Sequence, residues 1–241
     1  MGGQLRGLEL LMPNLKTKRK KAKAIRNSAA TTAAILNAAK KEFAFGGYSG
    51  ASIGKISRRA GTNERMIYYY YKSKEGLYIA VLEQAYAEMV DAENALDLDQ
   101  MDPREAIREL ISVIWKYYRE HPELIALVGS ENLERAIHIK KSRKLKKIAS
   151  PQLRILENLL SRGSSMGIFR TDIDAHRLFL TIAALGWFYF SNMHTLSNYL
   201  QKDLAGEPAL HEWLQHIIAV VLTSLAPTLS ANSGRSTILF P

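Results

Sequence analysis

The chain has 241 residues, of which 47% are hydrophobic, and it carries a formal net charge of +10 at pH 7. It can therefore bury a sizeable core in one large or two small domains, and the absence of cysteine from the sequence excludes disulfide and thiol chemistry. The longest nearly unbroken apolar run, residues 178–190, falls short of the roughly 20 residues that a membrane-spanning helix needs. The first 14 residues contain no evident signal peptide, so we expect a cytoplasmic protein without a membrane partner.

The positive charge is concentrated in the first third of the chain. Residues 1–74 contain 16 Lys and Arg residues against 3 Asp and Glu residues, a net charge of +13, whereas the rest of the chain carries 17 basic and 20 acidic residues, a net charge of −3. Seven of the basic residues lie between Lys16 and Arg26 with no acidic residue among them, so this run should be mobile in isolation. Such asymmetry indicates a surface for a polyanion such as nucleic acid.

Helical signals cover almost the whole chain, and no strand pattern competes with them. The glycine pair Gly46-Gly47 ends the first amphipathic helix, and a proline marks the start of later helices at Asp102-Pro103, Ser150-Pro151 and Glu207-Pro208. We expect helices over residues 27–45, 53–60, 63–71, 74–96, 103–120, a short segment after 122, 151–167, 172 or 174 to 200, and 208–226. The predicted fold class is all-α.

Residues 52–74 have the pattern of two short helices joined by a glycine turn. Ser52 and Asn63 can each accept a hydrogen bond from the first backbone N–H groups of a helix, so both are predicted N-caps. Gly61 lies between them, where a left-handed backbone would end the first helix. Proteins use this pattern to place one helix in the major groove of DNA, although an ordinary helical hairpin on a protein surface shows it too.

The second of these helices has distinct faces. Ile67 and Tyr71 are four residues apart and can face the core. The other sides then carry Glu64, Arg65, Tyr68 and Tyr69. These side chains can reach phosphates or base edges, and Arg65 is the natural reader of a guanine because a guanidinium can donate two hydrogen bonds to one base.

Residues 32–77 resemble the DNA-binding domain of the tetracycline-repressor (TetR) family of bacterial transcription regulators. The residues at the characteristic spacings of that family are Ile35-Leu36, Phe43, Gly47-Tyr48, Ser52, Ile56, Ala60-Gly61, Tyr68, Tyr71, Lys74 and Leu77. Beyond residue 77 the chain is similar to the family only in length and helical layout. The resemblance implies an N-terminal three-helix helix-turn-helix DNA-binding domain followed by a six-helix ligand-binding and dimerisation domain.

Carried over by position, the resemblance assigns DNA contacts. It implies that the recognition helix and its cap present to the groove Asn63, Glu64, Arg65, Met66, Tyr68, Tyr69 and Tyr70. It places on the DNA backbone Ser52, Gly54, Lys55 and Lys74. The basic run, including Lys18, Arg19 and Lys20, could reach the minor groove, as extensions of some relatives do. The family often has small residues where this chain has Arg65-Met66, so base specificity cannot be carried over, and Tyr70 and Tyr71 have an alternative role as packing aromatics.

The resemblance also implies the domain organisation. We expect a basic flexible arm over residues 1–26, the helix-turn-helix domain over 27–73, an effector-binding and dimerisation domain over 74–229 and a disordered tail over 230–241. Two copies would pair through the last two helices as a four-helix bundle, since the last helix is apolar over more than one face. A homodimer implies a pseudo-palindromic operator on double-stranded DNA, with half-sites about 34–36 Å apart.

A regulator of this type needs a cavity whose filling changes the separation of its two DNA-binding domains. The predicted effector is a small apolar or aromatic molecule with one polar end, because polar groups lie close to an aromatic run. The candidate lining residues, each with an alternative role in core, cap or surface, are Trp115, Tyr118, Glu131, Asn132, His138, Phe179, Trp187, Tyr189, Asn192 and His194. Residues 121–142 and 180–197 are similar to a branch of the family associated with aromatic or heterocyclic acids.

Other functions find less support in the sequence. His211 and His216 are five residues apart and do not share a helical face, so no metal or cofactor site is expected. Phosphate loops, nucleophile elbows and plausible carboxylate pairs are absent from the sequence, so an enzyme is not expected. The basic run at residues 140–147 is expected to be a solvated helix face, with a second contact to DNA or an acidic partner as the alternative. A non-specific architectural nucleic-acid-binding protein and a helical small-molecule-binding protein or enzyme are the other hypotheses.

Overall fold

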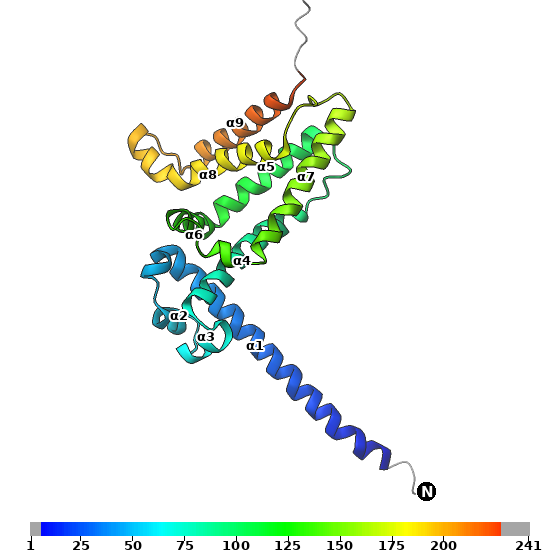
Figure 1. Ribbon diagram of the computed structural model, residues 1–241, viewed down its shortest axis with the longest axis vertical. Coiled ribbons are helices and arrows are strands. Elements are labelled where there is room, and N and C mark those ends of the chain that lie inside the picture. The colour runs from blue at the N-terminus through cyan, green and yellow to red at the C-terminus, as the bar shows by residue number, and fades with distance from the viewer. Residues whose placement is uncertain (1–5, 228–241) are drawn as a thin grey trace, which may run out of the picture. The chain divides into compact units, whose positions relative to one another are not determined.

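The computed structural model describes the backbone of residues 6–227 and, within that range, the side chains of residues 28–147 and 153–227. The helices in this part of the chain are α1 (Arg6–Gly50), α2 (Ile53–Arg59), α3 (Glu64–Tyr71), α4 (Lys74–Asn94), α5 (Pro103–Glu120), α6 (Pro122–Leu133), the 3₁₀ helix η1 (Ile139–Lys141), α7 (Leu145–Ser165), α8 (Ala175–Leu200) and α9 (Glu207–Leu225). No strand occurs among these residues, so the fold class is all-α, as predicted (Figure 1).

Packing divides the chain into two compact units. Unit 1 contains the described residues up to Tyr86 together with Glu123–Lys146, and unit 2 contains Ala87–Pro122 together with the described residues from Lys147 onward. The segment that contains α6 and η1 is predicted to belong to the effector domain, whereas in the structure residues 123–146 belong to the same compact unit as the helix-turn-helix. The packing boundary within the chain therefore falls inside α4, after Tyr86, and not at the start of that helix.

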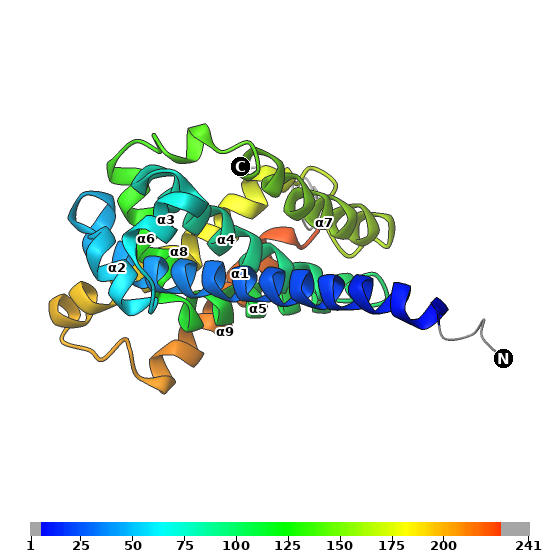
Figure 2. The same ribbon diagram turned by 90° about the horizontal axis from the view of Figure 1, so that it is seen from below.

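Unit 1 is built on the C-terminal half of α1, beside which α2 and α3 pack (Figures 1 and 2). The predicted glycine stop is seen as a bend at Gly47, whose φ of 63° and ψ of −175° are non-helical. At its other end α1 includes residues 6–26, where the sequence predicts a flexible arm. Residues 15–26 consist mainly of Lys, Arg, Ala and Leu, which are strong helix formers, so a continuous helix is the locally favoured conformation. Residues 1–5 and the predicted tail over 230–241 lie outside the described residues.

The core of unit 1 draws on all four of its N-terminal helices. Side chains that are fully buried include Ile35 and Phe43 of α1, Ile56 of α2, Ile67 of α3 and Leu77 of α4. Burying a side chain of this size contributes roughly 1.5–3 kcal/mol. The shared core therefore fixes α3 relative to α1 and leaves the opposite side of α3 open.

The start of α7 differs from the prediction. The helix begins at Leu145, before the Ser150-Pro151 pair that was expected to open it, so that prediction is wrong. Ser142 supplies the cap, because its hydroxyl accepts a hydrogen bond from the Leu145 N–H group at 3.1 Å. The basic residues between 140 and 147 are exposed, as predicted, but they lie on η1, a turn and the first turn of α7, not on one helix face.

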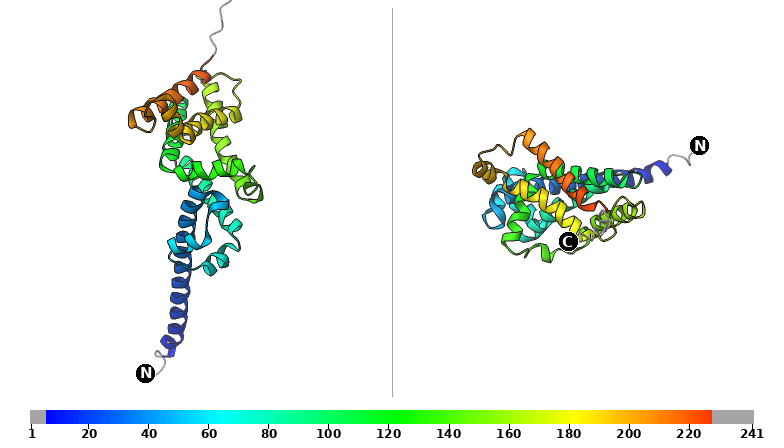
Figure 3. Two further views of the ribbon diagram at one scale, coloured as in Figure 1. Left: turned by 90° about the vertical axis from the view of Figure 1, so that its left-hand side faces the viewer. Right: turned by 90° about the horizontal axis from the view of Figure 1, so that it is seen from above.

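In unit 2, α5, α8 and α9 pack against one another (Figure 3). The predicted cap of α5 is confirmed, since Asp102 Oδ1 accepts hydrogen bonds from the N–H groups of Arg104 and Glu105 at 2.8 and 3.4 Å. Trp115 of α5 lies against Phe190 of α8, with ring centroids 4.4 Å apart. No helix in the described range is long and apolar enough to cross a membrane.

Candidate nucleic-acid interface and ligand cavity

The turn between α2 and α3 has the predicted geometry. Ser52 and Asn63 are the N-caps of the two helices, and their side chains accept hydrogen bonds from Lys55 N–H at 3.4 Å and Met66 N–H at 3.0 Å. Gly61 has a φ of +63°, the left-handed conformation that glycine adopts at little cost. These three local features set the direction of α3.

The residues of α3 divide between a buried and an exposed side. Glu64 and Arg65 are exposed, and Tyr68 and Tyr69 are 45% and 66% exposed, although large aromatic side chains are usually buried. Ile67 is fully buried. Of the predicted groove-facing residues between positions 64 and 69, all are exposed except Met66, which is half-buried.

Tyr70 and Tyr71 face α1. The Tyr71 hydroxyl donates a hydrogen bond to the Thr32 carbonyl at 3.2 Å, and the Tyr70 hydroxyl lies 3.1 Å from Ser28 Oγ. Burial raises the pKa of Tyr71 above its ordinary value, with a smaller contribution from Tyr70. The packing role is confirmed for Tyr71, and the contact with Ser28 favours the same role for Tyr70.

Two lysines that are predicted to contact phosphates are in contact with neighbouring groups of the protein. Lys55 of α2 has its Nζ 3.7 Å from Glu42 Oε1, and its side chain is 58% exposed. Lys74, at the start of α4, donates a hydrogen bond from Nζ to the Ser49 carbonyl at 3.2 Å and lies 5.0 Å from the ring centroid of Tyr48. Each cation is therefore held in place by its neighbours.

For the remaining residues that are predicted to contact DNA, the structure gives fewer contacts. Gly54 lies under the side chain of Glu64, since a Cβ atom on Gly54 would be 3.1 Å from Glu64 Oε1. The side chains of Lys18, Arg19 and Lys20 lie outside the described residues, although their backbone is part of α1.

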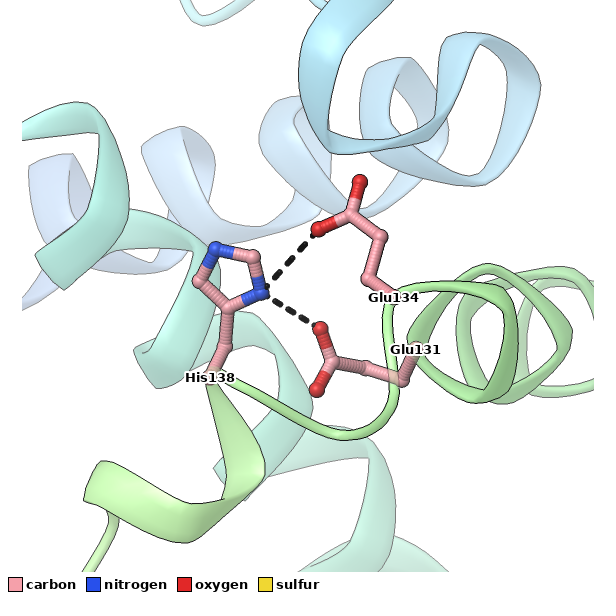
Figure 4. Close-up of side chains that lie close together, drawn as sticks. All are labelled: Glu131, Glu134 and His138. Carbon is pink, nitrogen blue, oxygen red and sulfur yellow. Dashed lines mark hydrogen bonds and ion pairs between the residues drawn. The ribbon is translucent and has the colours of Figure 1, made fainter.

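Unit 1 also contains a buried polar cluster of Glu131, Glu134 and His138 (Figure 4). His138 Nδ1 lies 2.6 Å from Glu131 Oε1 and 3.6 Å from Glu134 Oε2. The ligand-type atoms of the three side chains lie within 4.8 Å of one another, a spacing that a divalent cation could share. In the structure His138 is hydrogen-bonded to Glu131, and the second oxygen of Glu131 accepts the N–H of Ile139 at 3.1 Å.

Tyr78 of α4 is fully buried beside this cluster, with its ring centroid 4.9 Å from that of His138. Burial is the main cause that raises the pKa of Tyr78, from 10.0 to about 12, and the negative charge of Glu131 adds to it. The phenol is therefore held in its neutral form over a wide pH range.

Unit 2 contains a small cavity lined by residues of α4, α5, α7 and α8. Its volume is about 30 Å³, which holds about one water molecule. The lining residues are Met89, Glu93, Leu110, Ile114, Tyr118, Ile155, Leu156, Phe179, Ile182 and Ala183. Apart from the carboxylate of Glu93 and the hydroxyl of Tyr118, these side chains are apolar, so the cavity suits an apolar group.

Only some of the residues that are predicted to bind the effector line the cavity. Tyr118 and Phe179 line it. Trp115 and Tyr189 are buried in the adjacent aromatic packing, with ring centroids 5.2 Å apart, and Trp187 packs edge-on against Tyr118 at 5.9 Å.

The polar candidates lie elsewhere. Glu131 and His138 belong to the cluster of unit 1, and Asn132 is exposed in the same unit. Asn192 donates to the Phe188 carbonyl at 2.9 Å on its own helix, and His194 is exposed. These five side chains are absent from the lining of the cavity.

The aliphatic lining residues and Glu93 are not among the residues predicted for the effector site. The aliphatic residues carry no signal that separates them from ordinary core. Glu93 does carry such a signal. Buried residues recur every four positions along α4, at Leu77, Val81, Ala85 and Met89. The next position on this stripe is Glu93, and an acid at a core position is unusual.

Two family models match the sequence. Residues 35–81 match the model described as bacterial regulatory proteins, tetR family, and residues 103–221 match the tetracyclin repressor-like C-terminal domain. The first match contains α2 and α3, and the second contains the helices from α5 to α8 and most of α9.

Two named proteins are similar to this chain over different lengths. The HTH-type transcriptional repressor NicS of Pseudomonas putida is 44% identical over 191 residues, which cover 79% of this chain and 90% of that protein. The HTH-type transcriptional regulator RutR of Escherichia coli is 34% identical over 119 residues, 49% of this chain and 54% of that protein.

Solved structures share the fold. A TetR family transcription regulator from Marinobacter aquaeolei aligns with a TM-score of 0.62 at 21% identity, over 83% of this chain and 98% of that chain. The fatty acid degradation regulator FadR from Bacillus halodurans also aligns with a TM-score of 0.62, at 22% identity, over 79% of this chain and 94% of that chain.

Proposed function

This chain belongs to the tetR family of bacterial regulatory proteins and is a DNA-binding transcriptional regulator, and we propose that it is a repressor that a small effector releases from its operator. The observation that carries the proposal is the exposed side of α3, on which Arg65, Tyr68 and Tyr69 face solvent while Ile67 fixes the helix in the core. The protein acts in the cytoplasm, where its DNA target lies, and this function needs no catalytic step.

In the proposed complex, α3 enters the major groove. Arg65 donates to a base edge, and Tyr68 and Tyr69 contact bases or the backbone beside it. Lys55 and Lys74 bind phosphates on the flanking backbone, which fixes the register of α3 without reading sequence. The basic N-terminal run supplies further attraction to the polyanion, including Lys18, Arg19 and Lys20.

A homodimer through α8 and α9 places two such helices on one operator. Exposed apolar side chains on these helices support this interface: Leu180, Phe188, Tyr199, Leu200 and Val220. An interface on a two-fold axis uses the same patch on both subunits, so the operator should be a pseudo-palindrome.

The cavity of unit 2 is the proposed effector site. Its volume of about 30 Å³ is far below the roughly 300–1,000 Å³ of typical ligand sites, so an effector of ordinary size fits only after the lining side chains move apart. An effector binds an opened state, and only its preference for that state over the DNA-binding state can release the operator. The chain connection between the two sites is α4, which carries Lys74 in unit 1 and lines the cavity in unit 2.

The concentration of charge in residues 1–74 favours one alternative, a non-specific architectural binder. One experiment separates the two functions: genomic fragments are selected with the purified protein at physiological salt in excess competitor DNA, and the bound fragments are footprinted. Recovery of one palindromic sequence beside a gene cluster is expected. Recovery of unrelated fragments without a common sequence would favour the architectural binder.

A further inference from the structure

Glu93 is the one acidic side chain among the described residues that line the cavity of unit 2. We propose that the effector presents a hydrogen-bond donor or a positive charge to Glu93, while an apolar ring fills the rest of the cavity. This inference rests on the proposed function, because it names the chemical class of molecule that the effector site binds.

The fold directs Glu93 into the cavity. Met89 and Glu93 lie one turn apart on α4, and both line the cavity. Glu93 is 3% exposed, so its carboxylate has almost no access to bulk water. On the solvent side of α4, water would solvate a carboxylate. At this buried position the carboxylate instead needs hydrogen bonds from groups of the protein or from a molecule in the cavity.

The cavity offers Glu93 few polar neighbours. Tyr118 supplies the only other polar side-chain atom of the described lining, and the groups opposite are hydrocarbon, as at Ile114 and Ile182. Glu93 also takes part in an interaction within the protein, so its side chain has a partner before any ligand binds. When the cavity opens for a ligand, a purely apolar ligand adds nothing to the carboxylate, whereas a donor group adds a hydrogen bond.

The charge of Glu93 determines which polar group of the effector can lie beside it. An ionised carboxylate only accepts hydrogen bonds, and its bonds to N–H groups that carry positive charge are the strongest. A second carboxylate beside it is repelled, and repulsion is large where the surroundings are apolar. The expected effectors are therefore ring compounds with an amine, amidine or ring N–H group. This expectation differs from the aromatic or heterocyclic acids that the family resemblance suggests, because an ionised Glu93 would repel a carboxylate that carries no such donor.

The test measures how three single-ring probes bind to the full-length protein by ligand-observed NMR titration at neutral pH. Benzylamine is positively charged, benzyl alcohol is neutral and benzoate is negatively charged, and the three are similar in size. We expect benzylamine to bind at least about tenfold more tightly than benzoate, a difference of about 1.4 kcal/mol. In Glu93→Gln this preference should disappear, while the affinity for benzyl alcohol changes little.

Glu109→Gln is the matched control, because it makes the same charge change at an exposed position of α5 outside the cavity. It should keep the wild-type preference, and the thermal unfolding of both variants shows that they are folded. Ala183→Leu replaces a methyl group of the cavity lining by a larger branched side chain that fills the cavity, and it should abolish binding of all three probes. Binding that survives this change would place the probes elsewhere and would overturn the inference.

The outcomes separate the inference from the function on which it rests. Tighter binding of benzoate than of benzylamine, or an unchanged preference in Glu93→Gln, overturns the role of Glu93 and leaves an effector cavity in place. Failure of the wild type to bind any of the three rings contradicts an effector cavity altogether, and with it both the inference and effector-controlled release.

Discussion

His138 Nδ1 lies 2.6 Å from Glu131 Oε1, and each of the two residues is 1% exposed. The pair closes a turn in which Arg135 and Ala136 have φ values of 56° and 57°, an unfavourable left-handed conformation for residues with a Cβ atom. The His138 ring also lies against Tyr48, with centroids 4.3 Å apart. The pair thus holds the segment after α6 against the end of α1.

Removal of one partner from this pair should destabilise unit 1. In His138→Ala the Glu131 carboxylate stays buried without the imidazole, and such changes typically lower the free energy of unfolding by about 3–5 kcal/mol. His194→Ala, at an exposed position of α8, should change it by less than about 0.5 kcal/mol. Urea unfolding followed by circular dichroism measures both, and equal stability of the two variants would show that the pair contributes little.

Arg65 and Lys74 should differ in how they affect DNA binding. Arg65→Ala should weaken binding to the operator by about 1–3 kcal/mol and binding to random DNA only slightly, because a base contact is lost. Lys74→Ala should weaken both, because a phosphate contact carries no sequence information. Fluorescence anisotropy with the two DNAs measures the difference, and an equal loss on both DNAs for Arg65→Ala would remove its role in specificity.

The stability of the protein should fall at alkaline pH through Tyr78. Its pKa is raised from 10.0 to about 12 in the folded protein, so the stabilising contribution is complete below pH 10 and is lost as the pH rises towards 12. Two pH units correspond to roughly 2–3 kcal/mol. Urea unfolding at several alkaline pH values should show this slope, and Tyr78→Phe should reduce it.

Part of the alkaline slope should remain in Tyr78→Phe, since burial also raises the pKa values of Tyr71 and Tyr86. If the slope is the same with and without the Tyr78 hydroxyl, this tyrosine is not the group responsible.

Phe188 should contribute to the dimer. It is 55% exposed on α8, and Phe188→Asp would place a charge in the proposed apolar interface, raising the dimer dissociation constant by at least about tenfold. Phe45→Asp makes the same change at a side chain that is 92% exposed in unit 1, and it should leave the dimer intact. Sedimentation analysis gives both constants, and an unaltered dimer in Phe188→Asp would place the interface elsewhere.

The sequence predicted the helix-turn-helix closely because its signals are local. Ser52, Gly61 and Asn63 act through hydrogen bonds and backbone angles within a few residues, and the observed helices α2 and α3 begin next to the predicted caps. The start of α7 was misplaced because Pro151 resembles a first-turn proline, whereas the helix is capped earlier by Ser142.

The buried side chains around the cavity and the His138 cluster could not be derived in the same way. The left-handed turn at Arg135 and Ala136 contains no glycine or asparagine, the residues that would predict such a turn. The contact between His138 and Glu131 therefore could not be predicted from the local sequence. The placement of Phe179 in the cavity and of Trp115 beside it depends on which helices pack together, which one-dimensional periodicity does not specify.

The small size of the cavity has a consequence for the sensitivity of the regulator. Every effector must first widen the cavity by moving lining side chains such as those of Met89 and Phe179, and the work of opening is the same for all effectors of one size. The effector concentration at which repression ends therefore depends on the packing of the cavity lining as much as on the contacts that the effector makes. Trimming a lining residue that the effector never touches would make the protein respond to lower concentrations and to a wider range of molecules.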